Sequence, residues 1–268
     1  MLRFPQKPNL FFMLAVLCWM TTAVQAAPEP SQEISAITIL ADPALAAPLT
    51  QLASDYTRDN HISVSVSFLP SLEQNMAIEA GETADLFISA HPTLFAKLIQ
   101  KKVLTKDSTT PLVSTRLMLV SSAIQTRPVA ALDIKTFNQW RKDKNFLLVV
   151  ANPSAAAEGF YAEQVLRYLR KRIFLSDAVV QMQNTSDIVD FLAFTEGLGV
   201  MFESDALQSE SLSLIGKVPD EWYQKPTFTA AVLTAGSKQK TQKFLAYLQS
   251  NHAQRVFLKN GLYAAMPN

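Results

Sequence analysis

Residues 79–90 read Glu-Ala-Gly-Glu-Thr-Ala-Asp-Leu-Phe-Ile-Ser-Ala, and this stretch carries the clearest fold signals in the chain. Gly81 predicts the end of a helix, because glycine readily adopts the left-handed conformation that follows a last helical turn. The apolar run 86–88 is typical of an inner strand of a parallel sheet. Pro92 suits the first turn of a following helix. The pattern indicates an α/β sheet, in which ligands bind beyond the carboxyl ends of the strands.

The residues before this stretch continue the alternation of strand and helix. Residues 37–40 predict a buried strand, and Asp42 followed by proline predicts the start of a helix. Residues 62–68 alternate apolar and polar side chains, as a half-exposed strand does. Ser71 with Gln74 resembles a capping box at the start of the next helix. Repeated units of this kind predict a doubly wound, mostly parallel sheet.

A second set of such units follows later in the chain. Further strands are predicted at 117–120, 146–150, 199–202 and 230–233, and helices are predicted after Gly159 and over 239–250.

The first 26 residues are typical of an export signal. Arg3 and Lys7 precede an apolar core at 10–20, and Val-Gln-Ala at 24–26 fits a small-residue cleavage site. Cys18 lies inside the apolar core behind a bulky leucine, so we expect no lipid anchor there. We therefore expect cleavage near Ala26 and export to the periplasm.

Charge and composition argue against several classes of function. The chain has 24 basic and 23 acidic residues, and loss of the signal removes two of the basic ones, so nucleic acid is not an expected partner. The 49% apolar content supports a substantial core. The three histidines are far apart and the single cysteine leaves with the signal, so we expect neither a metal nor a cofactor. The chain has no Gly-x-Ser-x-Gly elbow and no phosphate loop, which argues against an enzyme.

Several segments together resemble one family. Residues 84–90 (Ala-Asp-Leu-Phe-Ile-Ser-Ala), 152–162, 198–206 and 244–261 are similar to landmark segments of periplasmic molybdate-binding proteins, the solute receptors of ABC importers. The resemblance extends from Ile37 to Gly261. It implies the type II periplasmic-binding-protein fold, which is an α/β fold of two lobes, each a mostly parallel sheet flanked by helices.

The resemblance also implies where the lobes begin and end. Residues 1–26 are the signal peptide, residues 27–120 with 230–268 form lobe 1, and residues 121–229 form lobe 2. The strands at 117–120 and 230–233 are then the two crossing strands.

The same resemblance implies a ligand site for a tetrahedral dianion, held by hydroxyls and by backbone N–H groups at helix ends. The matching positions are Ala44, Ser71, Glu158, Ile188 and Phe202. The family uses hydroxyls at the first, second and last of these, and only Ser71 keeps one. Loss of two hydrogen bonds to a charged group predicts about 10²- to 10⁴-fold weaker binding of such an anion.

Two carboxylates complicate this site. Asp42 is interpreted either as an ordinary helix cap, which would occupy the donors that an anion needs, or as a residue of the cleft. Glu158 either points to solvent or faces the cleft, where it would repel a dianion or recruit a cation. Ser71 is interpreted as a cap, a ligand contact or both.

These observations predict a monomeric, exported receptor that delivers a molybdate- or tungstate-type oxyanion to the membrane permease of an ABC importer. One alternative is a receptor for a different, less anionic solute. The other is an accessory periplasmic protein that binds no small molecule, which a cleft filled by Phe202 and Ile188 would favour.

Overall fold

A computed structural model describes residues 36–104, 108–122, 132–142, 146–175, 178–233 and 238–265. The predicted signal peptide and its cleavage site lie outside these residues. Among the helices in the described part of the chain, none is both long and apolar enough to cross a membrane.

The first half of the chain supplies strands and helices in alternation, as predicted. Its elements are β1 (Ala36–Ala41), the 3₁₀ turn η1 (Pro43–Leu45), α1 (Ala46–Asn60), β2 (Ser63–Phe68), α2 (Ser71–Glu79), β3 (Leu86–Ser89), α3 (Pro92–Gln100), β4 (Thr109–Ser114) and β5 (Leu117–Ser122).

The second half continues the pattern. Its elements are α4 (Ile134–Trp140), β6 (Leu148–Ala151), α5 (Ala157–Arg170), β7 (Val179–Met182), α6 (Thr185–Phe194), β8 (Leu198–Phe202), α7 (Glu203–Gln208), β9 (Leu212–Lys217), the 3₁₀ turn η3 (Asp220–Trp222), β10 (Thr227–Val232), α8 (Lys238–Leu248), α9 (Asn251–Lys259) and β11 (Tyr263–Ala264).

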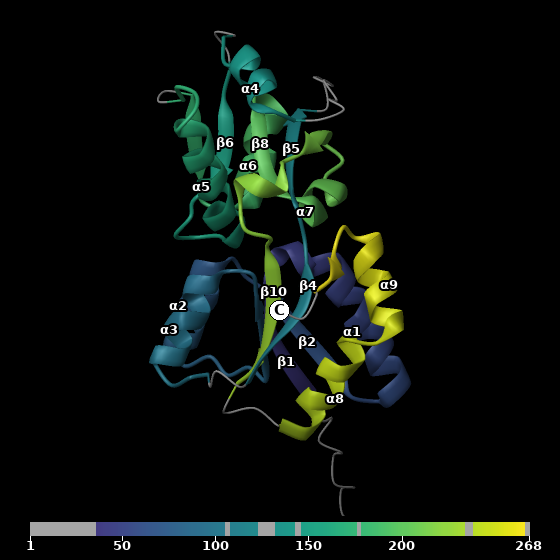
Figure 1. Cartoon of the computed structure of the whole chain (residues 1–268). Helices are drawn as coiled ribbons and strands as arrows, with labels where there is room; N and C mark the ends of the chain where they lie inside the picture. Colours follow the sequence, from purple (N-terminus) through teal and green to yellow (C-terminus); the bar gives the residue numbers. More distant parts are fainter. Residues whose placement is uncertain are drawn as a thin grey trace, which may run out of the picture. The chain divides into compact units, whose positions relative to one another are not determined.

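The first sheet is built from both ends of the chain, in the order β11-β4-β10-β3-β1-β2 (Figure 1). The strand β3 predicted from residues 86–88 lies inside it, parallel to β1 and antiparallel to β10. Gly81, with φ of +88°, ends the preceding helical segment in the left-handed conformation that was predicted.

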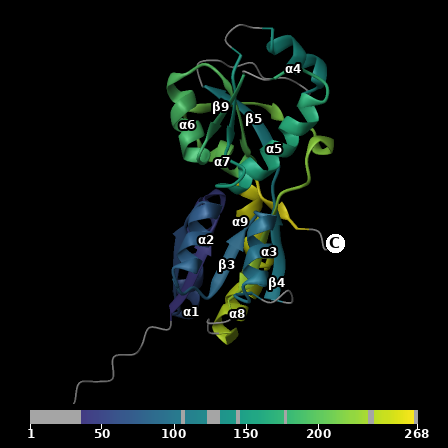
Figure 2. The same cartoon turned by 90° about the vertical axis from the view of Figure 1, so that its left-hand side faces the viewer.

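Side chains of this sheet alternate between two helical layers. Leu40, Phe87 and Ala231 belong to the apolar cluster that includes α3, whereas Ile39 and Ile88 belong to the larger core that includes α1, α8 and α9. Figures 1 and 2 show the same arrangement, with α2 and α3 on one face and α1, α8 and α9 on the other.

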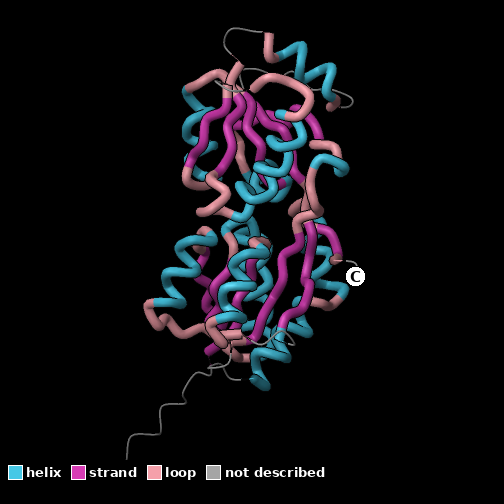
Figure 3. The backbone as a smooth tube through the Cα atoms, turned by 60° about the vertical axis from the view of Figure 1, so that its left-hand side comes forward, coloured by secondary structure: helices cyan, strands magenta, loops and turns pink. Residues whose placement is uncertain are grey.

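The second sheet comes from the middle of the chain, in the order β7-β6-β8-β5-β9. β6 is parallel to β7 and β8, and β5 is antiparallel to β8 and β9. Helix α6 packs through Ile188 and Leu192 on one face, and α5 packs through Val165 and Leu169 on the other. Figure 3 shows strands enclosed by helices in both sheets. The fold class is therefore α/β, with two mixed sheets flanked by helices.

The strands predicted to cross between lobes each lie within one sheet. β5 pairs only within the second sheet and β10 only within the first, among the described residues. The chain passes from one sheet to the other at 115–116 and again between β9 and β10. We propose a division into two lobes at these connections, a few residues from the boundaries that the sequence predicted.

Several hydrogen bonds join segments that belong to different sheets, and three of them lie close together. Tyr161 Oη donates to the carbonyl of Ala90 at 2.9 Å, and the Leu72 N–H donates to the carbonyl of Ala155 at 2.9 Å. His91 Nε2 lies 3.1 Å from the carbonyl oxygen of Pro153. All three involve the loop after β6 or the start of α5. A further hydrogen bond, from Tyr263 Oη of β11 to Glu203 Oε2 of α7 at 2.9 Å, joins the sheets elsewhere.

Candidate functional site

A pocket of about 560 Å³ lies beyond the carboxyl ends of strands from both sheets. Pro43 follows β1, Phe68 ends β2, Asn184 follows β7 and Asp205 follows β8, and all four residues line it. This is where the α/β rule placed a ligand. The full lining is Pro43, Phe68, Pro70, Glu73, Ala156, Glu158, Asn184, Thr185, Ser186, Val189, Asp190, Asp205, Gln208 and Ser209.

The charge of this lining has one sign. Glu73, Glu158, Asp190 and Asp205 are carboxylic acids, and no lysine, arginine or histidine is among the described residues of the lining. A dianion entering such a pocket meets repulsion without a compensating cation.

Asp42 is confirmed as a helix cap. Its side chain is 1% exposed, and its Oδ1 accepts a hydrogen bond from the Ala44 N–H at 3.1 Å, with Pro43 at the first position of η1. Burial raises the pKa of the Asp42 carboxyl well above its ordinary value, the charge on Glu158 raises it further, and the Ala44 N–H opposes the shift. The cap therefore occupies a donor that an anion would need.

Glu158 faces the pocket rather than solvent. It lies in the first turn of α5, is 4% exposed, and accepts a short hydrogen bond from Thr185 Oγ1 of α6. Burial raises the pKa of its carboxyl, and the hydrogen bond from Thr185 opposes this. Gly159 allows this placement, because a Cβ there would lie 2.5 Å from the carbonyl carbon and oxygen of Asn152.

Asp205 completes a group of three acids with Asp42 and Glu158, which we call the carboxyl cluster. Asp205 lines the pocket, and its Oδ2 is fully buried with no hydrogen-bond partner in the described residues. Burial raises its pKa well above the ordinary value, and the charges on Glu158 and Asp42 add to the shift. The three acids thus repel one another in a poorly solvated place.

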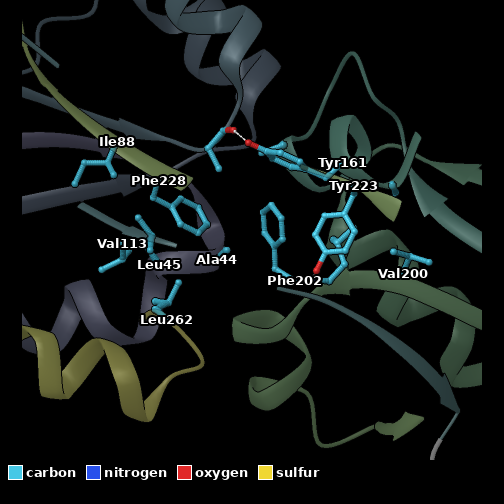
Figure 4. Close-up of a cluster of buried hydrophobic side chains, with 14 of the residues drawn as sticks. Ala44, Leu45, Ile88, Val113, Tyr161, Val200, Phe202, Tyr223, Phe228 and Leu262 are labelled. Carbon is cyan, nitrogen blue, oxygen red and sulfur yellow. Dashed lines mark hydrogen bonds between the residues drawn. The ribbon is translucent and has the colours of Figure 1, made fainter. Parts of the chain in front are cut away.

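Phe202 and Ala44 lie in an apolar cluster beside the pocket, with Tyr161 and Phe228 (Figure 4). Phe202 and Ala44 are both 0% exposed. The ring of Phe202 lies 5.6 Å from that of Phe228 and 6.1 Å from that of Tyr161, measured between centroids. The two positions that lack the family's hydroxyls are therefore filled by packed hydrocarbon.

Ile188 and Ser71 do not line the pocket. Ile188 is 0% exposed in the core of the second sheet, and its N–H points to the carbonyl of Asn184 within α6. The capping box predicted at Ser71 is wrong: Pro70 takes the cap position and Ser71 is the first helical residue. The buried Ser71 Oγ and both amide atoms of Gln74 have no hydrogen-bond partner in the described part of the chain.

Comparison with known proteins shows to which family this chain belongs. The family model for bacterial extracellular solute-binding proteins matches residues 37–263. The chain belongs to this family. Among curated relatives, the chain is 25% identical over 227 residues to the molybdate-binding protein ModA of Escherichia coli, covering 84% of this chain and 88% of the relative. These relatives are solute-binding proteins rather than enzymes.

Solved structures agree on the fold. A periplasmic molybdate-binding protein of Azotobacter vinelandii superposes with a TM-score of 0.69 at 17% identity, over 87% of this chain and all of that one. The substrate-binding domain of a putative molybdenum ABC transporter from Clostridium difficile gives a TM-score of 0.68 at 22% identity, with the same coverage. The type II periplasmic-binding-protein fold that the resemblance implied is confirmed.

Among the pocket residues that the sequence did not predict, Asp205 and Thr185 contribute most to the electrostatics of the site. Asp205 lies in the segment 198–206, which resembles a landmark segment of the family, three residues after the end of β8. Its position at the carboxyl end of a strand was a usable signal. No sequence signal pointed to Thr185, because its contact with Glu158 joins residues that are 27 positions apart on different helices.

Proposed function

We propose that this protein is the substrate-binding component of an ABC importer, exported with a cleaved signal peptide and active in the periplasm. The pocket carries the proposal, because residues that follow strands of both sheets line it. A receptor of this kind delivers its solute to a membrane permease, which we infer as the partner. The chain is expected to act as a monomer.

The relatives named for molybdate make a molybdate- or tungstate-type oxyanion the first ligand class to test. Calorimetric titration of the mature chain with molybdate and sulfate is the direct experiment. Because hydroxyls are missing at Ala44 and Phe202, we expect weak binding by the wild type. The double variant Ala44→Ser/Phe202→Tyr should bind molybdate more tightly, since each hydroxyl can donate to a charged oxygen. Tight wild-type binding would mean that the groups lining the pocket suffice without these two hydroxyls.

A receptor for a different solute is the second candidate, and the carboxyl cluster favours it. Glu73, Glu158, Asp190 and Asp205 line the space that an anion would enter, and Asp42 already accepts a hydrogen bond from the Ala44 N–H. The accessory-protein alternative gains no support from Phe202 and Ile188. Both are buried in cores, and the pocket is open beside them.

A further inference from the structure

The end of helix α5 carries the densest group of basic side chains in the described part of the chain. Arg167, Arg170, Lys171 and Arg172 are all exposed and fall within six consecutive residues. Glu163 is the only acid between residues 163 and 175, and its Oε1 lies 3.4 Å from Arg170 Nη1. Four cations and one acid leave an excess of three positive charges at this place.

An exposed aromatic ring lies next to these cations. Phe174 is 69% exposed, whereas Ile173 and Leu175 on either side of it are buried. An open hollow of about 400 Å³ is lined by residues 170–175, so the ring and three of the cations border the same space. We call the four basic residues together with Phe174 the α5 patch.

Part of this charge has a structural explanation. Arg172 Nη1 donates to the carbonyl of Tyr168 at 3.0 Å, and the guanidinium carbon lies 3.6 Å from the centroid of the Tyr168 ring. That ring stacks on Trp222 of the turn η3. Basic side chains at the end of a helix also interact favourably with its dipole. In the same turn, Asp220 is paired with Lys217 rather than with the α5 patch.

The rest of the α5 patch is not explained in this way. Lys171 has no hydrogen-bond or ion-pair partner for its ammonium group among the described residues. Phe174 exposes apolar surface that contributes nothing to the core, which costs free energy in water. Both side chains are therefore available to a partner that offers negative charge and an apolar layer together.

We infer that the α5 patch contacts an anionic membrane surface, with its cations on lipid phosphates and Phe174 at the boundary between headgroups and acyl chains. Basic side chains beside an exposed aromatic ring are typical of surfaces that lie on bilayers. Each basic residue near such a surface raises the affinity about fivefold.

The position of the α5 patch allows this contact without covering the pocket. Glu158 in the first turn of α5 lines the pocket, and the helix of 14 residues is about 21 Å long. The α5 patch lies at its other end. The contact adds to the proposed receptor function and does not depend on which solute the pocket binds.

The test is co-sedimentation of the mature chain with lipid vesicles at an ionic strength of about 10 mM, where the Debye length is about 30 Å. We expect binding to vesicles that contain phosphatidylglycerol, and at least about tenfold weaker binding to pure phosphatidylcholine vesicles. Salt at about 1 M should abolish the binding, because it reduces the Debye length to about 3 Å.

Two kinds of variant separate charge from apolar contact. Lys171→Gln should weaken binding to the phosphatidylglycerol vesicles about fivefold, and Arg170→Gln/Lys171→Gln should weaken it about 25-fold. Phe174→Ser should weaken it about tenfold, because the ring no longer enters the bilayer. All three side chains are exposed, so each variant should unfold at the same denaturant concentration as the wild type.

The chain offers a matched control for each kind of variant. Lys101→Gln replaces the exposed C-cap lysine of α3, which is the position that Lys171 has in α5, and should leave vesicle binding unchanged. Phe194→Ser removes a ring that is 94% exposed but lies between Asp190 and Glu196, and it should also have no effect.

The outcomes decide the inference without deciding the receptor function. Equal binding to both kinds of vesicle, or binding that the variants of the α5 patch do not change, would overturn it. Binding to soluble polyglutamate without binding to vesicles would also overturn it and would indicate an acidic protein as the partner. The calorimetric titration of solutes is a separate measurement, so the receptor function stands or falls independently.

Discussion

The apolar cluster and the carboxyl cluster lie side by side at the carboxyl ends of the same strands. The side chains of the first are closely packed, whereas those of the second are buried carboxyl groups that repel one another. Phe202 ends β8 and is wholly packed, whereas Asp205, three residues later, has a buried oxygen that no described residue contacts through a hydrogen bond. Ala44 is likewise packed, while the adjacent cap Asp42 is buried with a raised pKa. The first cluster contributes stability through packing, whereas the second holds buried acids whose pKa values are raised because burial disfavours their ionised form.

The largest expected effect on stability comes from removing a buried aromatic ring from the apolar cluster. Phe202→Ala should lower the free energy of unfolding by about 3–5 kcal/mol, because the ring is fully buried and leaves a cavity. Denaturant unfolding measures this. Phe194→Ala is the matched control, since that ring is 94% exposed and its loss should change stability by less than about 0.5 kcal/mol. Equal effects would contradict the packing described for Phe202.

Adding a hydroxyl to the same cluster should cost less. Phe202→Tyr places an oxygen among Tyr161, Phe228 and Ala44, and it should destabilise the free protein by about 1–3 kcal/mol if the hydroxyl finds no partner. The same unfolding measurement with molybdate present shows whether an anion supplies that partner. A variant as stable as the wild type without ligand would show that the cluster contains an acceptor or a water site.

Removing a charge from the carboxyl cluster should raise the free energy of unfolding, whereas the changes to the apolar cluster should lower it. The pKa of Asp205 is raised in the folded protein, so the folded state binds more protons than the unfolded one and stability falls as pH rises through that range. Asp205→Asn should therefore be more stable than the wild type by about 1–2 kcal/mol near pH 7 to 8, the cost of an unsatisfied buried group.

The pH dependence identifies the cause of that gain. Below the ordinary carboxyl pKa of 3.8 the wild-type acid is protonated in both states, so the difference between Asp205→Asn and wild type should disappear. Glu82→Gln, which alters an exposed acid, should show no such profile. A variant that is less stable than the wild type at neutral pH would mean that Asp205 has a favourable partner.

The smallest expected effect concerns the link between the sheets. Tyr161→Phe removes the hydrogen bond to the Ala90 carbonyl and should lower stability by about 0.5–1.5 kcal/mol. Denaturant unfolding at several ligand concentrations would show whether this bond also contributes to ligand affinity. Tyr168→Phe on the same helix is the control, because no hydrogen bond from its hydroxyl is seen among the described residues.

Local signals predicted most of the fold. Gly81, Pro92 and the apolar run before Ser89 identified a helix end, a helix start and an inner strand, because each depends on neighbouring residues only. The capping box failed because Pro70 also fits the cap position, and the choice between them depends on how α2 meets the preceding loop.

The site was harder to predict because it depends on side-chain direction. Matching to the family drew attention to Glu158 and Phe202, but the sequence could not show that one faces a pocket and the other a packed core. The contact between Glu158 and Thr185, and the mutual repulsion of three acids, arise only from tertiary structure.

The most direct test of the central claim is native mass spectrometry of the mature chain isolated from the periplasm, which weighs any bound small molecule. We predict that the wild type carries a bound small solute, and that Glu158→Gln and Asp205→Asn change its occupancy whereas the exposed Glu82→Gln does not. A chain that is isolated with no bound solute, or whose bound solute is unaffected by both pocket variants, would contradict this account of the pocket.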